Sequence, residues 1–268
     1  MTKIKTKHLQ EFKDKEVPIV EIFGNTLQGE GPRLRPAIFI RTGLCNFTCA
    51  GFGCEREAPD GSKIQGCDSI MAVSKKFKNT WTHYSNFNDI VNKVKPLIHP
   101  DQDIKQDIII TGGEPTLHIG TQCMESLLEY YISRGHWITM ETNGSRMVNL
   151  DRDYHKQIQF SMSVKLNNSG EPKKKRINIP AIQNMIANGK ESYLKFVVNP
   201  ETWDADYLEI QEILKELPTL ANVYLMPIGE TRDKQIQNTQ FVFDKCAEHG
   251  FNFSSRVHIL AYNDKDGV

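Results

Sequence analysis

Apolar residues recur along the chain with two alternating periods, which predict strands and helices in succession. Short apolar runs predict strands at 37–42, 107–111, 137–141, 158–164, 193–198, 223–226 and 253–260, after an extended segment at 17–25. Between them, apolar residues spaced three or four positions apart predict helices at 87–98, 121–134, 203–217 and 233–249. Gly135 and Gly250 stand where two of these helices are expected to end.

This alternation, with short turns between the elements, is typical of parallel βαβ units. Several such units in succession indicate an α/β protein built as a barrel or as part of one, with functional residues where the strands end. The polar motifs of the chain do follow the predicted strands. We therefore expect one site to be formed by Arg41, Gly112-Gly113-Glu114, Glu141-Thr142-Asn143 and Ser163-Val164-Lys165.

Composition and charge are those of one soluble domain without repeats. The 33 Lys and Arg residues balance 33 Asp and Glu residues, so the net charge gives no support for nucleic-acid binding. No apolar stretch approaches the length that spans a bilayer, and residues 1–15 are polar with no apolar core after them. A cytoplasmic protein is expected. The basic run Lys173-Lys174-Lys175-Arg176 is typical of a solvated loop and is assigned no function.

Cysteines are concentrated in one early segment, which holds Cys45, Cys49, Cys54 and Cys67 of the 6 in the chain. This concentration indicates a metal site. A structural zinc site would use all four thiolates in a closed tetrahedron. An iron–sulfur cluster held by three thiolates would leave one iron open to a substrate or cofactor. Spacing alone leaves both alternatives open. Disulfides are not expected, because a chain of this size can bury an adequate core without them.

The surroundings of the cysteines carry a resemblance to a known family. The chain is similar to the radical S-adenosylmethionine enzymes and, among them, to the 7-carboxy-7-deazaguanine synthases. The motifs that resemble this family are Gln28-Gly29-Glu30-Gly31, the strand ending at Arg41, Gly43-Leu44-Cys45-Asn46, Cys67-Asp68-Ser69, Thr111-Gly112-Gly113-Glu114-Pro115 and Ser255-Arg256-Val257-His258-Ile259. The resemblance implies one domain over 1–268, folded as a partial, open (β/α) TIM-like barrel of the radical S-adenosylmethionine type.

The same resemblance implies a [4Fe–4S] cluster on Cys45, Cys49 and Cys67. The family commonly has two residues between its second and third cysteines, whereas this chain has an insertion at about 50–66. Cys67 is chosen as the third ligand because Asp68-Ser69 follows it, as Asp-Thr follows in the family. Cys54 lies in the insertion and is the rival third ligand.

Further roles are implied residue by residue. The residues that the resemblance implies for binding S-adenosylmethionine are Gly112, Gly113, Glu114, Glu141, Asn143, Ser163 and Lys165. The family has proline where this chain has Val164. Those for the substrate fall on Gln28, Gly29, Glu30, Arg41 and His258, of which His258 lies in a predicted strand. Ser69 is the implied Mg²⁺ ligand, and its hydroxyl is the hard donor that this ion prefers. Arg35 replaces a glycine common in the family's loop.

The implied reaction is radical and ring-contracting. An electron from the reduced cluster releases a 5′-deoxyadenosyl radical, which takes hydrogen from C6 of 6-carboxy-5,6,7,8-tetrahydropterin. Ring contraction with loss of ammonia then gives 7-carboxy-7-deazaguanine, in the manner of a lyase of queuosine biosynthesis. The resemblance also implies a homodimer and an external reductant such as flavodoxin. Two alternatives stay open: another radical enzyme such as a glycyl-radical activase, and a zinc-stabilised binding protein without catalysis.

Overall fold

The centre of the molecule is one mixed sheet. A computed structural model of the chain describes residues 15–50, 54–101, 103–218, 221–263, 265 and 267. Within these ranges nine strands form the sheet in the order β11-β10-β9-β8-β7-β6-β2-β1-β5, and β3 and β4 form a separate hairpin. The strands are β1 (Val17–Leu27), β2 (Pro36–Thr42), β3 (Cys54–Glu57), β4 (Lys63–Gly66), β5 (Thr82–Tyr84), β6 (Asp107–Gly112), β7 (Ile138–Thr142), β8 (Ile158–Ser163), β9 (Tyr193–Val198), β10 (Asn222–Pro227) and β11 (Asn252–Phe253).

From β2 through β6 to β11, neighbouring strands are parallel. β1 and β5 extend the sheet on the other side as antiparallel strands. β5 and β11 are the two edges and do not pair with each other in the described ranges, so the sheet stays open. This confirms the prediction of an α/β fold with an open, partial barrel.

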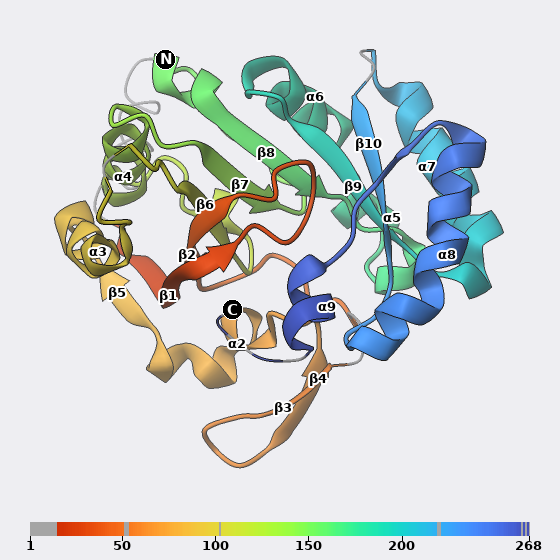
Figure 1. Cartoon of the computed structure of the whole chain (residues 1–268), viewed down its shortest axis with the longest axis horizontal. Coiled ribbons are helices and arrows are strands. Elements are labelled where there is room, and N and C mark those ends of the chain that lie inside the picture. Colours follow the sequence, from red (N-terminus) through yellow and green to blue (C-terminus); the bar gives the residue numbers. More distant parts are fainter. Residues whose placement is uncertain are drawn as a thin grey trace, which may run out of the picture.

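Helices cover the sheet from outside (Figure 1). In the described ranges α4 packs on β7, α6 on β8, α7 on β9 and α8 on β10, as crossover helices do in βαβ units. The helices are α2 (Ile70–Val73), α3 (Phe87–Val94), α4 (Gln122–Ile132), α5 (Lys173–Arg176), α6 (Ile179–Asn188), α7 (Trp203–Glu216), α8 (Arg232–His249) and α9 (Val257–Tyr262). None of these helices combines the length and hydropathy that a bilayer crossing requires.

The apolar runs form strands because both faces of the sheet are covered. Ile108, Ile109 and Ile110 are all fully buried in β6, as expected for a parallel strand with packing on both sides. The predicted helix ends are confirmed as well. α8 ends at His249, and Gly250 follows it with a φ of 71°. Gly135 has a φ of 78° in the turn after α4.

Two sequence predictions are wrong. The predicted strand at 253–260 is the short β11 followed by α9, so His258 lies on a helix. The chain leaves the sheet after Ser254, because Val257 N–H donates to Gly29 O instead of continuing along β10. The basic run forms α5 instead of a loop, and although its three lysines are exposed as expected, Arg176 is only 2% exposed.

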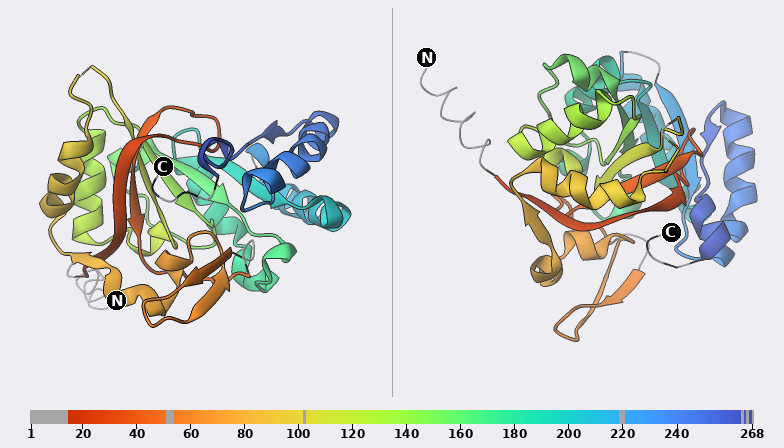
Figure 2. Two further views of the ribbon diagram at one scale, coloured as in Figure 1. Left: turned by 60° about the horizontal axis from the view of Figure 1, so that its bottom comes forward. Right: turned by 60° about the vertical axis from the view of Figure 1, so that its left-hand side comes forward.

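The insertion after Cys49 contains a hairpin that the sequence did not indicate. β3 and β4 pair in register from Cys54 with Gly66 to Glu57 with Lys63. The hairpin projects from the body of the molecule in Figures 1 and 2. Residues 51–53 of the insertion and residues 1–14 of the polar N-terminal segment lie outside the described residues. Helix α6 was not predicted either. It begins after Asn178, whose side chain accepts from Ala181 N–H at 3.2 Å.

Candidate active site

The carboxyl ends of the parallel strands border a cavity of about 620 Å³. Strands of a parallel sheet all end on one side, so residues that follow different strands meet there. Most of the predicted site residues line this cavity: Gln28, Glu30, Arg41, Cys45, Cys49, Cys67, Ser69, Gly112, Gly113, Glu141, Asn143, Ser163, Lys165 and His258. Gly29 and Glu114 lie in the part of the chain that the structure describes but do not line the cavity.

The cysteine segment forms one wall of the cavity. Cys54 lines the same cavity, and all of these cysteines are free thiols. Burial raises the pKa of Cys45 to about 11 and the pKa of Cys67 to about 12, so both thiols keep their protons at neutral pH. The hairpin pairs Cys54 with Gly66, the residue before Cys67. The two candidate third ligands therefore lie close together.

Gly112 and Gly113 pack against the backbone that leads into Cys45. A Cβ on Gly112 would lie 2.0 Å from Thr42 O, and one on Gly113 would lie 2.0 Å from Leu44 O. The φ of 134° at Gly112 also favours glycine. Glu114 N–H completes the contact by donating to Leu44 O at 2.8 Å. These glycines thus permit the end of β6 to pack directly on the cysteine segment.

The Glu114 carboxylate is fully buried and organises the next turn. Its Oε1 accepts from Thr116 N–H at 3.1 Å, from Thr116 Oγ1 at 2.5 Å and from Thr142 Oγ1 at 2.6 Å. Its Oε2 accepts from Asn143 N–H at 2.7 Å. In this structure the carboxylate therefore joins the turn after β6 to the turn after β7.

The turn after β7 is tied to both ends of the site. Asn143 Nδ2 donates to Asn46 Oδ1 at 2.9 Å, which connects it to the cysteine segment. Glu141 accepts from Gln28 Nε2 at 2.9 Å and from Thr111 Oγ1 at 2.8 Å, which connects it to the loop after β1 and to β6. The lining side chains are thus held by hydrogen bonds before any ligand binds.

Arg41 and Ser69 are in direct contact. Arg41 Nη1 donates to Ser69 Oγ at 3.0 Å, while its Nε donates to Glu21 at 2.7 Å. Ser69 Oγ in turn donates to Asp68 Oδ1 at 3.3 Å. On the opposite strands, Lys165 Nζ donates to Ser163 Oγ at 3.0 Å.

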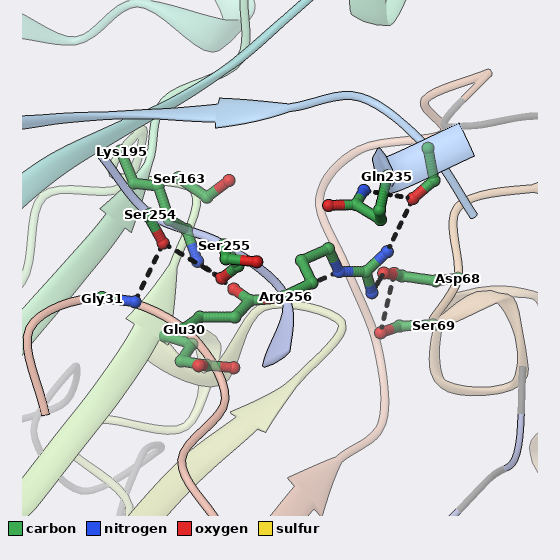
Figure 3. A network of polar contacts seen from close by, with 12 residues as sticks. Glu30, Gly31, Asp68, Ser69, Ser163, Lys195, Gln235, Ser254, Ser255 and Arg256 are labelled. Carbon is green, nitrogen blue, oxygen red and sulfur yellow. Dashed lines mark hydrogen bonds and ion pairs between the residues drawn. The ribbon is translucent and has the colours of Figure 1, made fainter. Parts of the chain in front are cut away.

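A network of charged side chains also lines the cavity (Figure 3). Glu30 is ion-paired with Lys195 of β9 and with Arg256 Nε, the latter at 3.1 Å. Arg256 Nη2 also reaches Asp68 Oδ2 at 2.5 Å. Burial raises the pKa of Glu30, but the charges of Lys195 and Arg256 outweigh it and leave that pKa well below its ordinary value. Glu30 is therefore a carboxylate at neutral pH.

His258 packs against the loop after β1. A Cβ on Gly29 would lie 2.3 Å from His258 Nδ1, so glycine is required for this approach. Burial lowers the pKa of His258, and the charge of Glu30 opposes that shift. Gly29 thus shapes the site by allowing His258 into its wall.

The chain resembles known proteins over nearly its whole length. No protein-family model matches it. A 7-carboxy-7-deazaguanine synthase of Halobacterium salinarum is 29% identical over 92% of this chain and 91% of the relative. One of Pyrobaculum aerophilum is 25% identical over 94% of this chain and 97% of the relative. The chain is thus similar to 7-carboxy-7-deazaguanine synthases over nearly its whole length.

The fold agrees with this similarity. The crystal structure of QueE from Escherichia coli superposes with a TM-score of 0.61 at 22% identity, covering 92% of this chain and 97% of that chain. The family belongs to the radical S-adenosylmethionine enzymes, which bind that cofactor and a [4Fe–4S] cluster. In this chain Cys45, Cys49 and Cys67 line the cavity as free thiols, the ligand type of such a cluster.

The cavity wall carries thiols, the ligand type that iron–sulfur clusters use. Among the described residues, no group of three or more His, Cys, Asp or Glu side chains is arranged to hold one metal ion. The thiolates of a cluster bind separate irons and need not converge on one point. Cys45, Cys49 and Cys67 line one cavity, and the positive charge of Lys165 lowers the pKa of each thiol against the effect of burial. Metal binding would complete their deprotonation.

Sequence reasoning missed Lys195 as a site residue. It stands in the apolar run Tyr193–Val198, and its side chain is 5% exposed. A lysine inside a buried strand is costly unless it is paired, which is a signal that the sequence did contain. Its partner Glu30 could not be read from the sequence, because the two residues are 165 positions apart.

Proposed function

We propose that the chain is a 7-carboxy-7-deazaguanine synthase. It would convert 6-carboxy-5,6,7,8-tetrahydropterin to 7-carboxy-7-deazaguanine by ring contraction with loss of ammonia, as a carbon–nitrogen lyase. The observation that carries this proposal is that the cysteine segment and the Glu30–Arg256 network line one cavity. Relatives that bear this name along almost the full chain support it.

The cofactors would occupy the end of the cavity near the cysteines. Cys45, Cys49 and Cys67 would hold the [4Fe–4S] cluster, and S-adenosylmethionine would lie beside Gly112, Gly113, Asn143 and Ser163. When bound, this pair supplies a 5′-deoxyadenosyl radical that removes a hydrogen atom from the substrate. The protein would orient the reactants and exclude water. Glu114 would act by holding the turns after β6 and β7, which already carry its four hydrogen bonds.

The substrate would lie in the cavity beside the loop after β1 and the helix α9, which both contribute lining residues. The carboxylate of Glu30 and the side chain of Gln28 suit the ring N–H and amino groups of a pterin. Arg41 suits its carboxylate, because a guanidinium can donate two parallel hydrogen bonds. Mg²⁺ would bind at Ser69, whose Oγ already meets Arg41 and Asp68. The proposal further includes a homodimer and an external reductant such as flavodoxin.

Anaerobic reconstitution with iron and sulfide tests this proposal. The assay would contain dithionite, S-adenosylmethionine, Mg²⁺ and carboxytetrahydropterin, with wild type, Cys54→Ala and Cys67→Ala. We expect carboxydeazaguanine from wild type and Cys54→Ala and none from Cys67→Ala. If Cys54 proves essential and Cys67 dispensable, Cys54 is the third cluster ligand and the proposed function is unaffected. A protein that binds zinc through all four thiols and no cluster would overturn the radical function.

A further inference from the structure

A segment far along the chain holds the loop that carries Cys49. Thr48, the residue before it, donates from its backbone N–H to Glu171 Oε1 at 2.5 Å and from its hydroxyl to the same oxygen at 3.3 Å. Ala50, the residue after it, donates from its N–H to Ser169 O at 3.1 Å. Both backbone neighbours of Cys49 are thus bonded to residues 169–171.

The second oxygen of Glu171 is ion-paired. Lys175 belongs to α5, and its Nζ lies 2.7 Å from Glu171 Oε2 in the segment before that helix. The same ammonium lies 5.3 Å from the centroid of the Phe47 ring, also in the cysteine loop. The Glu171 side chain is 5% exposed and that of Lys175 is 41% exposed. A nearly buried carboxylate therefore meets the cysteine loop on one side and a half-exposed cation on the other.

Arg176 makes this segment rigid. Its Nε donates to Glu171 O at 2.9 Å, its Nη1 donates to Lys165 O at 2.8 Å, and its Nη2 is ion-paired with Glu209 at 2.6 Å. Lys165 lines the same cavity as the cysteines. One buried guanidinium thus joins the backbone at Lys165 to the backbone at Glu171, the residue that accepts from the cysteine loop. Lys173 of the same helix instead pairs with Glu212 at the surface, with side chains 55% and 61% exposed.

We propose that Glu171 and Lys175 are positioning residues for the iron–sulfur cluster. They would hold the Cys45–Cys49 loop in its cluster-binding form, and their opposite charges would set the reduction potential of the cluster. The inference rests on the proposed function, because it requires a cluster on Cys45 and Cys49. Partners outside the first ligand shell commonly change metal affinity about 10–100-fold when they are mutated. Nearby charge and hydrogen bonding also tune cluster potentials.

The test compares Glu171→Ala, Glu171→Gln and Lys175→Gln with wild type. Lys173→Gln is the matched control, because it removes a charge from the same helix without touching the cysteine loop. Each protein is reconstituted anaerobically with iron and sulfide. The measurements are the rate of loss of cluster absorbance after an iron chelator is added, the midpoint potential of the cluster, and the Tm. Glu171→Gln keeps an acceptor for Thr48 N–H and so separates charge from hydrogen bonding.

We expect Glu171→Ala to lose its cluster about 10-fold faster than wild type. Glu171→Gln should raise the midpoint potential, because a nearby negative charge opposes reduction. Lys175→Gln should lower it by less, since its ammonium is more exposed and better screened. Lys173→Gln should match wild type in all three measurements.

Unchanged chelation rates and potentials in the Glu171 and Lys175 variants would overturn the inference. A lower Tm with an unchanged potential would do the same, because it would reduce Glu171 to a packing role. Glu171→Gln preserves the size of the side chain and decides the outcome if Glu171→Ala does not fold. If the wild-type protein takes up no iron, the proposed function is overturned as well. If the wild type binds a cluster normally and the variants match it in chelation rate and potential, only this inference is overturned.

Discussion

Arg256, at the start of α9, donates to Asp68, the residue that directly follows Cys67. The same guanidinium pairs with Glu30 in the loop after β1 and donates to Gly229 O after β10. Arg256 is 5% exposed. One buried cation therefore joins the C-terminal helix, the cysteine segment and the Gln28-Gly29-Glu30 loop, and the shape of the proposed substrate site depends on it.

Replacing Arg256 with Met should impair substrate use more than cluster binding. The change leaves Asp68 without this partner and frees the loop that carries Glu30. A shift of about 1 Å in positioning groups can cost about 100-fold in rate. We expect kcat/KM for the carboxypterin to fall by about that factor while iron and sulfide content stay at the wild-type level. Steady-state kinetics and iron analysis of the reconstituted protein measure both.

Arg232→Met is the matched control for Arg256→Met. Arg232 also anchors α9, but through the neutral acceptors Leu260 O at 2.8 Å and Ala261 O at 2.9 Å, in an exposed setting. It should retain most of the activity. Equal losses in the two variants would show that attachment of α9, rather than the charge of Arg256, is what the site requires.

The buried Glu30–Lys195 pair should make stability depend on pH in two directions. Glu30 has a lowered pKa, so its contribution is present above its ordinary pKa of about 4.3 and is lost as pH falls below it. Burial lowers the pKa of Lys195, but Glu30 and Glu141 outweigh it and raise that pKa. Its contribution is therefore present below about pH 10.4 and is lost as pH rises further.

Glu30→Gln should lower the free energy of unfolding by about 3–5 kcal/mol at pH 7, because it leaves the buried Lys195 without its main partner. The difference from wild type should shrink as pH falls below about 4.3, because the Glu30 carboxyl of the unfolded wild-type chain then takes up a proton while that of the folded chain stays ionised. Urea denaturation from pH 7 to pH 3.5 measures this. Glu55→Gln, from the exposed pair of Glu55 with Lys63, should change stability by less than about 1 kcal/mol. A constant difference at all pH values would show that packing, not charge, explains the loss.

Gly113→Ala should displace the cysteine segment. The new Cβ would lie 2.0 Å from Leu44 O, and relief of that clash would disturb the bond from Glu114 N–H to the same oxygen. We expect a loss of about 1–3 kcal/mol in stability and a lower iron content after reconstitution. Gly120→Ala is the control, because its φ is 93° but its Cβ would meet nothing within 4 Å. It should cost about 1–2 kcal/mol through backbone strain and leave iron content unchanged.

The sequence predicted the elements that depend on local pattern and missed those that depend on distant partners. The buried strand with Ile108, Ile109 and Ile110 follows from its apolar run and the flanking glycines. The structure of the C-terminal segment could not be predicted from its local pattern. Val257, Ile259 and Leu260 are as compatible with a strand as with a helix, and α9 forms where Arg256 bonds to Glu30 and Asp68. No local pattern encodes that choice.

The same limit applies to the basic run at Lys173–Arg176. Four consecutive cations usually lie in solvent, yet Arg176 is buried by Glu209 and by the carbonyl groups of Glu171 and Lys165. Glu209, its ion-pair partner, lies on α7 and could not be assigned to Arg176 from the local sequence. The glycines of the cavity wall were easier to predict, because Gly112 and Gly113 end an apolar strand. The surface that they approach, Thr42 and Leu44, was visible only in three dimensions.

Glu114→Gln separates two roles for the buried carboxylate. Glu114 accepts four hydrogen bonds, and a carboxylate is the side chain that offers acceptors only. The amide group of a glutamine would place N–H donors against another donor, either Asn143 N–H or the donors of Thr116 and Thr142. We expect a loss of about 1–3 kcal/mol in stability, and weaker binding of S-adenosylmethionine because the Asn143 turn lines the cavity. Urea denaturation and calorimetric titration of the reconstituted protein measure the two effects, with Glu129→Gln on the exposed face of α4 as control. Weaker cofactor binding at wild-type stability would instead indicate that Glu114 meets the cofactor's ammonium group directly.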